Sequence, residues 1–272
     1  MPSDQPIGIF DSGIGGLTVL SHIRQMLPKE HLIYVSDRAH LPYGNKDEAF
    51  VLKRAQHITR FLMQRQVKGI VIACNTATAA AVKHLRAAYD LPIVGMEPGV
   101  KPAIQLSSRG RIGVLATQGT LSSGKFRSLL REHARESQVI ICPCQGWVEA
   151  IEFMGPEHPE TREIVHRQLQ PVLESGVDTL VLGCTHYPFL KSRIEESAGS
   201  AVTIIDTGPA VARQLFRRLE EQDLLNRCDQ PGQEEFWCSA PPEQTRELIE
   251  RLRGQPTRVQ ALPEEPIWDT RS

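Results

Sequence analysis

Two similar stretches of the sequence constrain the fold most, because each joins a buried strand to a cysteine. The first, residues 69–78, reads GIVIACNTAT, and the second, residues 179–188, reads TLVLGCTHYP. Each begins as a short, uncharged apolar run, which is typical of a strand buried on both faces. Cys74 and Cys184 are therefore expected at the carboxyl ends of strands, where open α/β sheets form their ligand-binding crevices.

Strand-like and helix-like segments alternate along most of the chain, which favours a mainly parallel sheet covered by helices on both faces. Besides the two strands that end at the cysteines, the pattern predicts strands at residues 7–10, 31–35, 92–96, 111–115, 139–142, 202–205 and 235–239. It predicts helices at residues 17–27, 46–66, 78–89, 121–135, 147–154, 160–175, 189–197, 209 to about 221, and 242–253.

The two halves of the chain repeat this pattern with nearly the same spacing. Asp11 precedes Cys74 by 63 positions (74 − 11), and Thr117 precedes Cys184 by 67 positions (184 − 117). We interpret the repeat as a duplicated α/β unit, giving two pseudo-symmetric domains whose strand ends face one shared cleft. The first domain is expected to comprise residues 1–98 and a returning segment, 209–272, and the second residues 99–208.

Composition and charge exclude several classes of protein. The 272 residues are 40% hydrophobic and carry a formal net charge of −1, so neither a nucleic-acid partner nor an anionic membrane partner is expected. No apolar run reaches transmembrane length, and residues 1–6 lack the features of a signal peptide. We therefore expect a cytoplasmic location, in which the six cysteines stay reduced.

A cleft with one thiol on each wall suits a reaction that needs two mirror-image proton transfers. The ordinary pKa of a thiol, about 8.5, allows it to act as a base when ionised and as an acid when protonated. Asp11, His186 and Glu152 are the candidates for accepting a thiol proton or stabilising its charge. Turn and helix N-terminal amides would hold ligand carboxylates. Polar residues near the thiols would bind a small polar ligand, namely Ser12, Asn75, Thr76, Thr120 and Thr185.

Five motifs carry a specific resemblance to a known family. They are DSGIGGLT at residues 11–18, PYG at 42–44, CNTA at 74–77, VEAIE at 148–152 and GCTHYP at 183–188. In this order, between Ile7 and about Leu262, the chain resembles bacterial glutamate racemase, of the cofactor-independent aspartate/glutamate racemase superfamily. The resemblance implies interconversion of L- and D-glutamate without organic cofactor or metal, and supply of D-glutamate for peptidoglycan.

The resemblance also implies roles for individual residues. Cys74 is implied to take the α-proton of D-glutamate and Cys184 that of L-glutamate. Asp11, Glu152 and His186 are implied to assist the two thiols. The substrate pocket is implied to be lined by Asp11, Ser12, Tyr43, Gly44, Asn75, Thr76, Thr117, Thr120, Thr185 and His186.

Other interpretations of single motifs stay open. The stretch CPCQGW at residues 142–147 departs from the single Cys-Pro-Gly-type turn of the family, which leaves Glu149 as an alternative to Glu152. No second Cys/His pair at ligand spacing accompanies Cys142 and Cys144, so no metal site is expected. The turn at residues 13–16 lacks the third glycine of a dinucleotide fingerprint, because Thr18 stands there.

Rival functions also stay open. Racemisation of aspartate or of a hydantoin would need only a differently shaped pocket. A two-lobed amino-acid-binding protein would have inert thiols, and a thiol hydrolase or transferase would need only one of the two. We further expect a homodimer, because closure of a cleft between lobes often depends on a stabilising interface.

Overall fold

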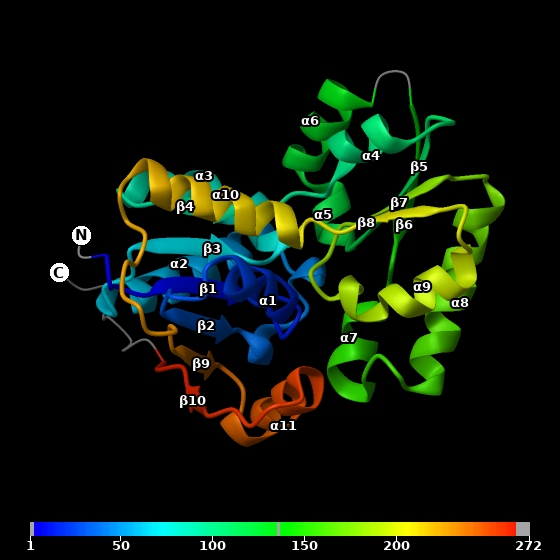
Figure 1. Ribbon diagram of the computed structural model, residues 1–272. Coiled ribbons are helices and arrows are strands. Elements are labelled where there is room, and N and C mark those ends of the chain that lie inside the picture. The colour runs from blue at the N-terminus through cyan, green and yellow to red at the C-terminus, as the bar shows by residue number, and fades with distance from the viewer. Residues whose placement is uncertain (1–2, 135–136, 265–272) are drawn as a thin grey trace.

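The computed structural model describes residues 3–134 and 137–264, which form two parallel sheets flanked by helices (Figure 1). The larger sheet has the strand order β10-β9-β2-β1-β3-β4, and the smaller sheet the order β6-β5-β7-β8. All strand pairs in both sheets are parallel. The predicted α/β class with two helix-flanked sheets is therefore confirmed.

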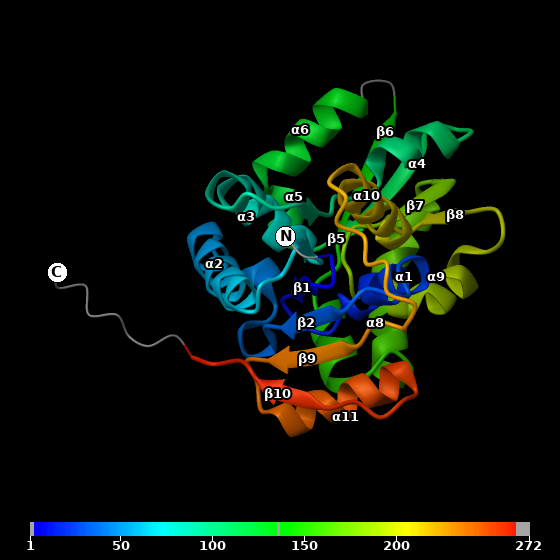
Figure 2. The ribbon, with the colours of Figure 1, turned by 60° about the vertical axis from the view of Figure 1, so that its left-hand side comes forward.

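The larger sheet takes strands from both ends of the chain, and Figure 2 shows β9 and β10 beside β2. Its strands are β1 (Ile7–Asp11), β2 (Leu32–Ser36), β3 (Gly69–Ile72), β4 (Ile93–Gly95), β9 (Glu234–Cys238) and β10 (Val259–Ala261). Its helices are α1 (Leu17–Met26), α2 (Glu48–Gln64), α3 (Asn75–Ala88), α10 (Gly208–Glu221) and α11 (Pro242–Arg253), with 3₁₀ turns η1 (Arg38–His40) and η2 (Tyr43–Asn45).

Alternating residues of β1 pack on opposite faces of this sheet. Ile9 belongs to the apolar cluster that includes Leu20 of α1 and Leu215 of α10. Phe10 belongs to a second cluster, with Ile58 of α2 and Leu85 of α3. Because helices cover both faces, the central strands β1 and β3 are wholly buried, as their continuous apolar sequences predict.

The smaller sheet is formed by the middle of the chain. Its strands are β5 (Arg111–Ala116), β6 (Gln138–Pro143), β7 (Thr179–Leu182) and β8 (Thr203–Ile205). Around it lie α4 (Val100–Leu106), α5 (Gln118–Ser122), α6 (Gly124–His133), α7 (Trp147–Glu149), the π-helical turn η3 (Ala150–Met154), α8 (Pro159–Glu174), the 3₁₀ turn η4 (Tyr187–Leu190) and α9 (Lys191–Ala198).

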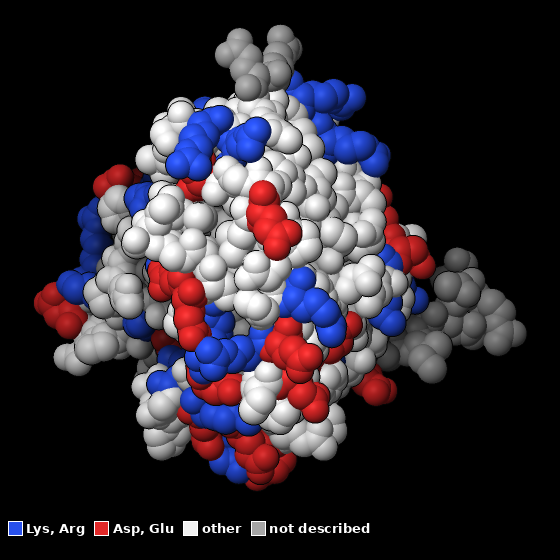
Figure 3. All heavy atoms as spheres, turned by 90° about the vertical axis from the view of Figure 1, so that its right-hand side faces the viewer, with Lys and Arg blue, Asp and Glu red and all other residues white. Residues whose placement is uncertain are grey.

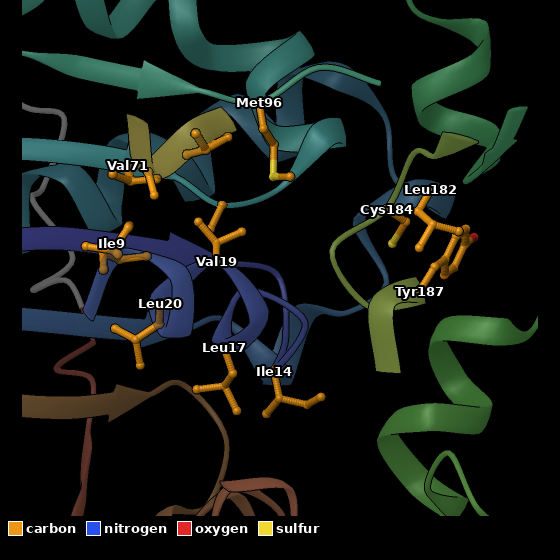
Figure 4. Packing of buried hydrophobic residues seen from close by; sticks show 14 of the residues in the cluster. Ile9, Ile14, Leu17, Val19, Leu20, Val71, Met96, Leu182, Cys184 and Tyr187 are labelled. Atoms are coloured by element: carbon orange, nitrogen blue, oxygen red, sulfur yellow. The ribbon is translucent and has the colours of Figure 1, made fainter. Parts of the chain in front are cut away.

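One apolar cluster extends across both sheets (Figure 4). It contains Ile9 and Val71 on strands β1 and β3 of the larger sheet and Leu182, Cys184 and Tyr187 at the end of the smaller one. The packing therefore fixes the strand ends of one sheet against those of the other.

The predicted strands are all present, with ends that shift by one or two residues. Two predicted helices need correction. Helix α3 begins at Asn75 and not at residue 78, because Cys74 takes the N-cap position and its Sγ accepts a hydrogen bond from the backbone N–H of Ala77 at 3.4 Å. The helix predicted at 121–135 is two helices, because the extended backbone of Ser123 separates α5 from α6. Arg135 lies outside the described residues.

Further differences are local. The segment predicted as one helix at 147–154 is a single α-turn followed by a π-helical turn, and the one predicted at 189–197 begins with the 3₁₀ turn η4. Helix α4 and strand β10 were not predicted, since each is short and α4 carries Pro102 in its first turn. The sequence predicts a loose end at residues 264–272, and residues 265–272 lie outside the described residues. The domain boundaries at 98 and 209 stay a prediction.

The described helices include none that is both long and apolar enough to cross a membrane. On the face of the molecule seen in Figure 3, basic and acidic side chains lie interspersed over the lower half, and basic side chains predominate among the charged groups near the top.

Candidate active site

The two strand-end cysteines line one cavity between the sheets. Cys74 and Cys184 each stand two residues beyond the end of their strand, β3 and β7 respectively, and both side chains are buried. The space between the atoms that line the cavity, open solvent included, is about 270 Å³. The predicted binding residues that line it are Ser12, Tyr43, Gly44, Asn75, Thr76, Thr117, Thr120, Thr185 and His186. Asp11 and Glu152 lie behind this lining and contact it through hydrogen bonds.

The first wall places the Cys74 thiol beside a carboxylate. The thiol lies 3.8 Å from Ser12 Oγ, and Asp11 accepts hydrogen bonds from the backbone N–H groups of Ser12 and Gly16, both at 2.7 Å. Burial, and next the charge of Asp11, raise the pKa of Cys74 well above its ordinary value. Burial also raises the pKa of Asp11, against the opposing charge of His186. This wall therefore favours the protonated thiol.

The second wall places the Cys184 thiol beside a cation. Cys184 Sγ lies 3.8 Å from His186 Nδ1, and His186 Nε2 lies 2.8 Å from Glu152 Oε1. Burial by itself lowers the pKa of His186, but its hydrogen bonds to Cys184 and Glu152 outweigh burial and raise that pKa well above the ordinary value. The raised pKa places a positive charge on His186 directly beside Cys184 Sγ.

Glu152 is the anchor of this second wall. Its buried carboxylate accepts hydrogen bonds from the backbone N–H of Ile14 at 2.7 Å and from Arg38 Nε at 2.8 Å. Burial acts to raise the pKa of Glu152, but the hydrogen bond and charge of His186 outweigh it and lower the pKa. Glu149, the alternative from the sequence, is half-buried and does not contact His186 within the described residues.

The glycine-rich turn after β1 allows the two lobes to approach closely. A Cβ at Gly13 would lie 2.0 Å from Glu152 Oε1, and one at Gly15 would lie 2.3 Å from His186 Nδ1. Any residue larger than glycine at either position would displace the Glu152–His186 pair. The glycines therefore serve this contact between lobes.

Polar groups gather on the side of the cavity near α5. Thr76 Oγ1 lies 3.0 Å from Thr117 Oγ1 and 3.1 Å from Thr120 Oγ1, which forms a cluster of three hydroxyls. Within the described part of the chain, neither amide atom of the buried Asn75 side chain has a hydrogen-bond partner. Buried amides are seldom left unpaired, so a polar ligand is the natural partner of Asn75.

The sequence did not predict Asp37 and Arg54, which fix the position of Tyr43 through hydrogen bonds. Asp37 accepts a hydrogen bond from the Tyr43 hydroxyl at 2.5 Å and two from Arg54, at 2.8 and 2.9 Å. Burial acts to raise the pKa of Asp37, but hydrogen bonds from His40 and Arg54 outweigh it and lower the pKa to about 2. Asp37 directly follows β2, so the strand-end rule that found Asp11 also applies to it.

Some other groups contribute little to the site. The described residues contain no group of three or more His, Cys, Asp or Glu placed to hold a metal ion. All six cysteines are free thiols. Pro42, Val148 and Gly183 line the cavity without a predicted role.

Two parallel sheets that share a cavity, with a strand-end thiol from each, define a class of two-lobed α/β enzymes with paired cysteines. The sequence pattern of the Asp/Glu/Hydantoin racemases matches residues 7–215. The chain belongs to this family of racemases.

Relatives of known activity agree with this family assignment. The chain is 51% identical to the glutamate racemase of Methylococcus capsulatus over 261 residues, which is 96% of each chain. It is 48% identical to that of Pseudomonas aeruginosa over 257 residues, 94% of this chain and 97% of the relative. The resemblance to bacterial glutamate racemase is thereby confirmed.

The fold is shared with glutamate racemase RacE1 of Bacillus anthracis, at a TM-score of 0.88 and 32% identity over 96% of this chain and 98% of that one. It is also shared with Escherichia coli glutamate racemase, solved with L-glutamate and the activator UDP-MurNAc-ala, at a TM-score of 0.86 and 32% identity over 96% and 100% of the two chains.

Proposed function

We propose that this protein interconverts L- and D-glutamate, with Cys74 and Cys184 acting as acid and base on opposite faces of the α-carbon. The observation that carries the proposal is that two buried thiols, each at the end of a strand, line one cavity. The choice of glutamate is supported by the activity of the relatives and by the E. coli racemase solved with L-glutamate.

In the direction from L to D, Cys184 acts as the thiolate base. The imidazolium of His186, held by Glu152, stabilises that thiolate before it takes the α-proton. Cys74, kept as a thiol by burial and by Asp11, gives its proton to the opposite face of the α-carbon. One proton leaves the substrate and one arrives, so the products are D-glutamate, a Cys184 thiol and a Cys74 thiolate. The roles exchange for D-glutamate.

The polar lining would hold the substrate in place without a metal or organic cofactor. The amide of Asn75 offers both a donor and an acceptor, and the hydroxyls of Thr76, Thr117 and Thr120 offer donors. Backbone N–H groups at the start of α3 offer a site for a carboxylate. Tyr43, Gly44 and Thr185 complete the proposed pocket.

A coupled assay with both enantiomers of glutamate and of aspartate tests the substrate. Turnover of glutamate alone supports the proposal. Turnover of aspartate alone would show that aspartate, and not glutamate, is the substrate. Binding without turnover would favour the amino-acid-binding protein. Full activity of a variant that lacks one of the two thiols would favour a thiol hydrolase or transferase.

Exchange in deuterium oxide tests the two-base mechanism. The donating thiol equilibrates with solvent before turnover, so product from either enantiomer should carry deuterium at the α-carbon from the first turnover. Early unreacted substrate should stay largely unlabelled, because the base returns the proton that it abstracted. A proton NMR time course at low conversion measures both pools. Substantial protium in the product, or rapid labelling of residual substrate, would refute a facing pair of bases.

The wider role is also part of the proposal. A cytoplasmic racemase of this kind would supply D-glutamate for peptidoglycan, and cells depleted of it should then require D-glutamate in the medium.

The domain division and the oligomeric state are proposed as well. The division into a first domain, residues 1–98 with 209–272, and a second domain, residues 99–208, would allow the cleft to open for substrate. Sedimentation of the purified protein tests the proposed homodimer.

A further inference from the structure

Two thiols outside the proposed mechanism lie side by side at the end of an edge strand. Cys142 and Cys144 flank Pro143, where β6 ends at the edge of the smaller sheet (Figure 1). Their Sγ atoms are 3.9 Å apart. Both side chains are buried, but Pro143 and Gln145 next to them are exposed. Cys142 retains 7% and Cys144 4% of its surface exposed, so Cys142 is the more accessible of the two thiols.

We propose that Cys142 and Cys144 form a dithiol modification site, which a low-molecular-weight disulfide oxidises to an intrachain disulfide that disturbs the Cys184 wall of the cavity. The effect on activity rests on the proposed racemase function, whereas formation of the disulfide does not.

The distance between the sulfurs suits this reaction. A disulfide bond is about 2.05 Å long, so the two Sγ atoms, 3.9 Å apart, must approach by somewhat less than 2 Å. If the two side chains share the movement, each sulfur moves by about 1 Å, within the reach of a χ1 adjustment and a small shift of the turn. Only one residue separates the cysteines, so the closed ring is small and tightens the backbone at residues 142–144.

The contacts assign different roles to the two thiols. Cys144 donates its S–H toward Cys142 Sγ, and this hydrogen bond lowers the pKa of Cys142. Burial raises the pKa of Cys144 well above its ordinary value. Cys142 accepts this hydrogen bond and is the more exposed of the two, so it is assigned as the attacking thiol, and Cys144 as the thiol that resolves the mixed disulfide.

The oxidation balances with glutathione disulfide as the oxidant. The Cys142 thiolate attacks one sulfur of glutathione disulfide, forms a mixed disulfide and releases one glutathione thiolate. Cys144 then loses its proton and attacks Cys142 Sγ, which releases the second glutathione. The protein loses two protons and two electrons, and the oxidant leaves as two molecules of glutathione.

The turn at Cys144 is linked to the Cys184 wall by direct contacts. The backbone carbonyl of Cys144 accepts a hydrogen bond from the Tyr187 hydroxyl at 3.5 Å, and Tyr187 follows His186 in the chain. The ring of Trp147 packs edge-on against Tyr187 with centroids 5.0 Å apart, and the segment that begins at Trp147 carries Glu152. A tightened turn therefore shifts both ends of the Glu152–His186 pair.

Peptide mapping after oxidation tests the site. The purified protein is incubated with glutathione disulfide, denatured and alkylated, and its peptides are weighed. We expect the peptide with Cys142 and Cys144 to lose the mass of two hydrogen atoms, and Cys74 and Cys184 to be alkylated. In the Cys144→Ser variant we expect one glutathione to remain on Cys142. Full alkylation of both cysteines after oxidation would overturn the proposal.

Activity provides the second readout. Oxidation should lower kcat/KM by about tenfold or more, because displacements near 1 Å at a reacting group are costly, and dithiothreitol should restore it. The double variant Cys142→Ala/Cys144→Ala should keep its activity in the oxidant, whereas Cys228→Ser, which alters an exposed thiol, should lose activity like the wild type. Loss of activity in the double variant, or a disulfide without any loss in the wild type, would overturn the link to the Cys184 wall.

Discussion

Replacement of Glu152 by glutamine tests the buried network behind the Cys184 thiol. Glu152 accepts hydrogen bonds from Ile14 and Arg38 and pairs with His186, all within 2.8 Å. Glutamine keeps the shape but removes the charge opposite the imidazolium. A hydrogen bond to a charged group contributes about 1.5–3 kcal/mol. If about 3 kcal/mol of this stabilisation acts in the transition state, kcat/KM falls by roughly 10²-fold.

The equilibrium between the enantiomers limits how the loss in kcat/KM is distributed between the two directions of the reaction. L- and D-glutamate have equal free energies in water, so kcat/KM must fall by the same factor in both directions. An effect that depends on direction can appear only in kcat and KM taken separately. Polarimetry or a coupled assay, run from each enantiomer, supplies both constants and checks their consistency.

The pH profile gives the same variant a second readout. Glu152 contributes to the raised pKa of His186, so the glutamine variant should lose its imidazolium at lower pH than the wild type. The basic limb of kcat/KM should therefore move toward lower pH. Glu149→Gln is the matched control, one turn away and half-buried, and should be nearly neutral. A folded Glu152→Gln variant with more than about a tenth of wild-type activity, or a severe Glu149→Gln variant, would refute the reasoning.

Three further predictions test other parts of the site. Cys74→Ser and Cys184→Ser should each lower kcat/KM by several orders of magnitude, because a hydroxyl is a much weaker acid than a thiol; activity near the wild-type level in either folded variant contradicts the two-base proposal. Asp37→Asn should lower the free energy of unfolding by about 2–3 kcal/mol at pH 7, from a pKa of about 2 in the folded state and about 3.9 unfolded. Since the folded pKa is the lower one, urea titrations should show this difference shrinking as the pH falls from about 4 to about 2; a difference that does not change with pH contradicts the ionised Asp37. Dialysis against a chelator should leave activity unchanged, and recovery only on addition of metal would contradict the metal-free proposal.

The sequence predicted those parts of the molecule that depend on local patterns. Apolar runs followed by polar residues located every strand near the two cysteines, and the same rule placed Asp11 at the end of β1. The repeat spacing predicted two α/β units, and the structure has two parallel sheets. These inferences succeeded because a strand buried on both faces has a nearly continuous apolar sequence.

The parts that sequence patterns could not predict depend on contacts between distant segments. Glu152 and Ile14 are 138 positions apart, and the hydrogen bond between them selects Glu152 over Glu149. A helical period cannot make that choice, because the two glutamates are one turn apart and the segment between them changes from α to π. The contact between Asp37 and Tyr43 was not predicted, because the spacing of apolar residues carries no information about a hydrogen bond between two polar side chains.

Under the proposed mechanism, the duplicated scaffold supplies the two thiols, and the different residues beside each thiol explain how one site can serve both enantiomers. The reaction needs one thiol ionised and the other protonated, whereas two equivalent buried thiols would both stay protonated near neutral pH. His186, held by Glu152 and with its pKa raised, lies beside Cys184, whereas burial and the charge of Asp11 raise the pKa of Cys74. Under the proposed mechanism Cys184 is the base for L-glutamate, and each turnover of L-glutamate leaves the enzyme in the form that accepts D-glutamate. This asymmetry cannot shift the equilibrium between enantiomers, so its effect falls on kcat and KM for each direction and on the proton exchange that resets the thiols.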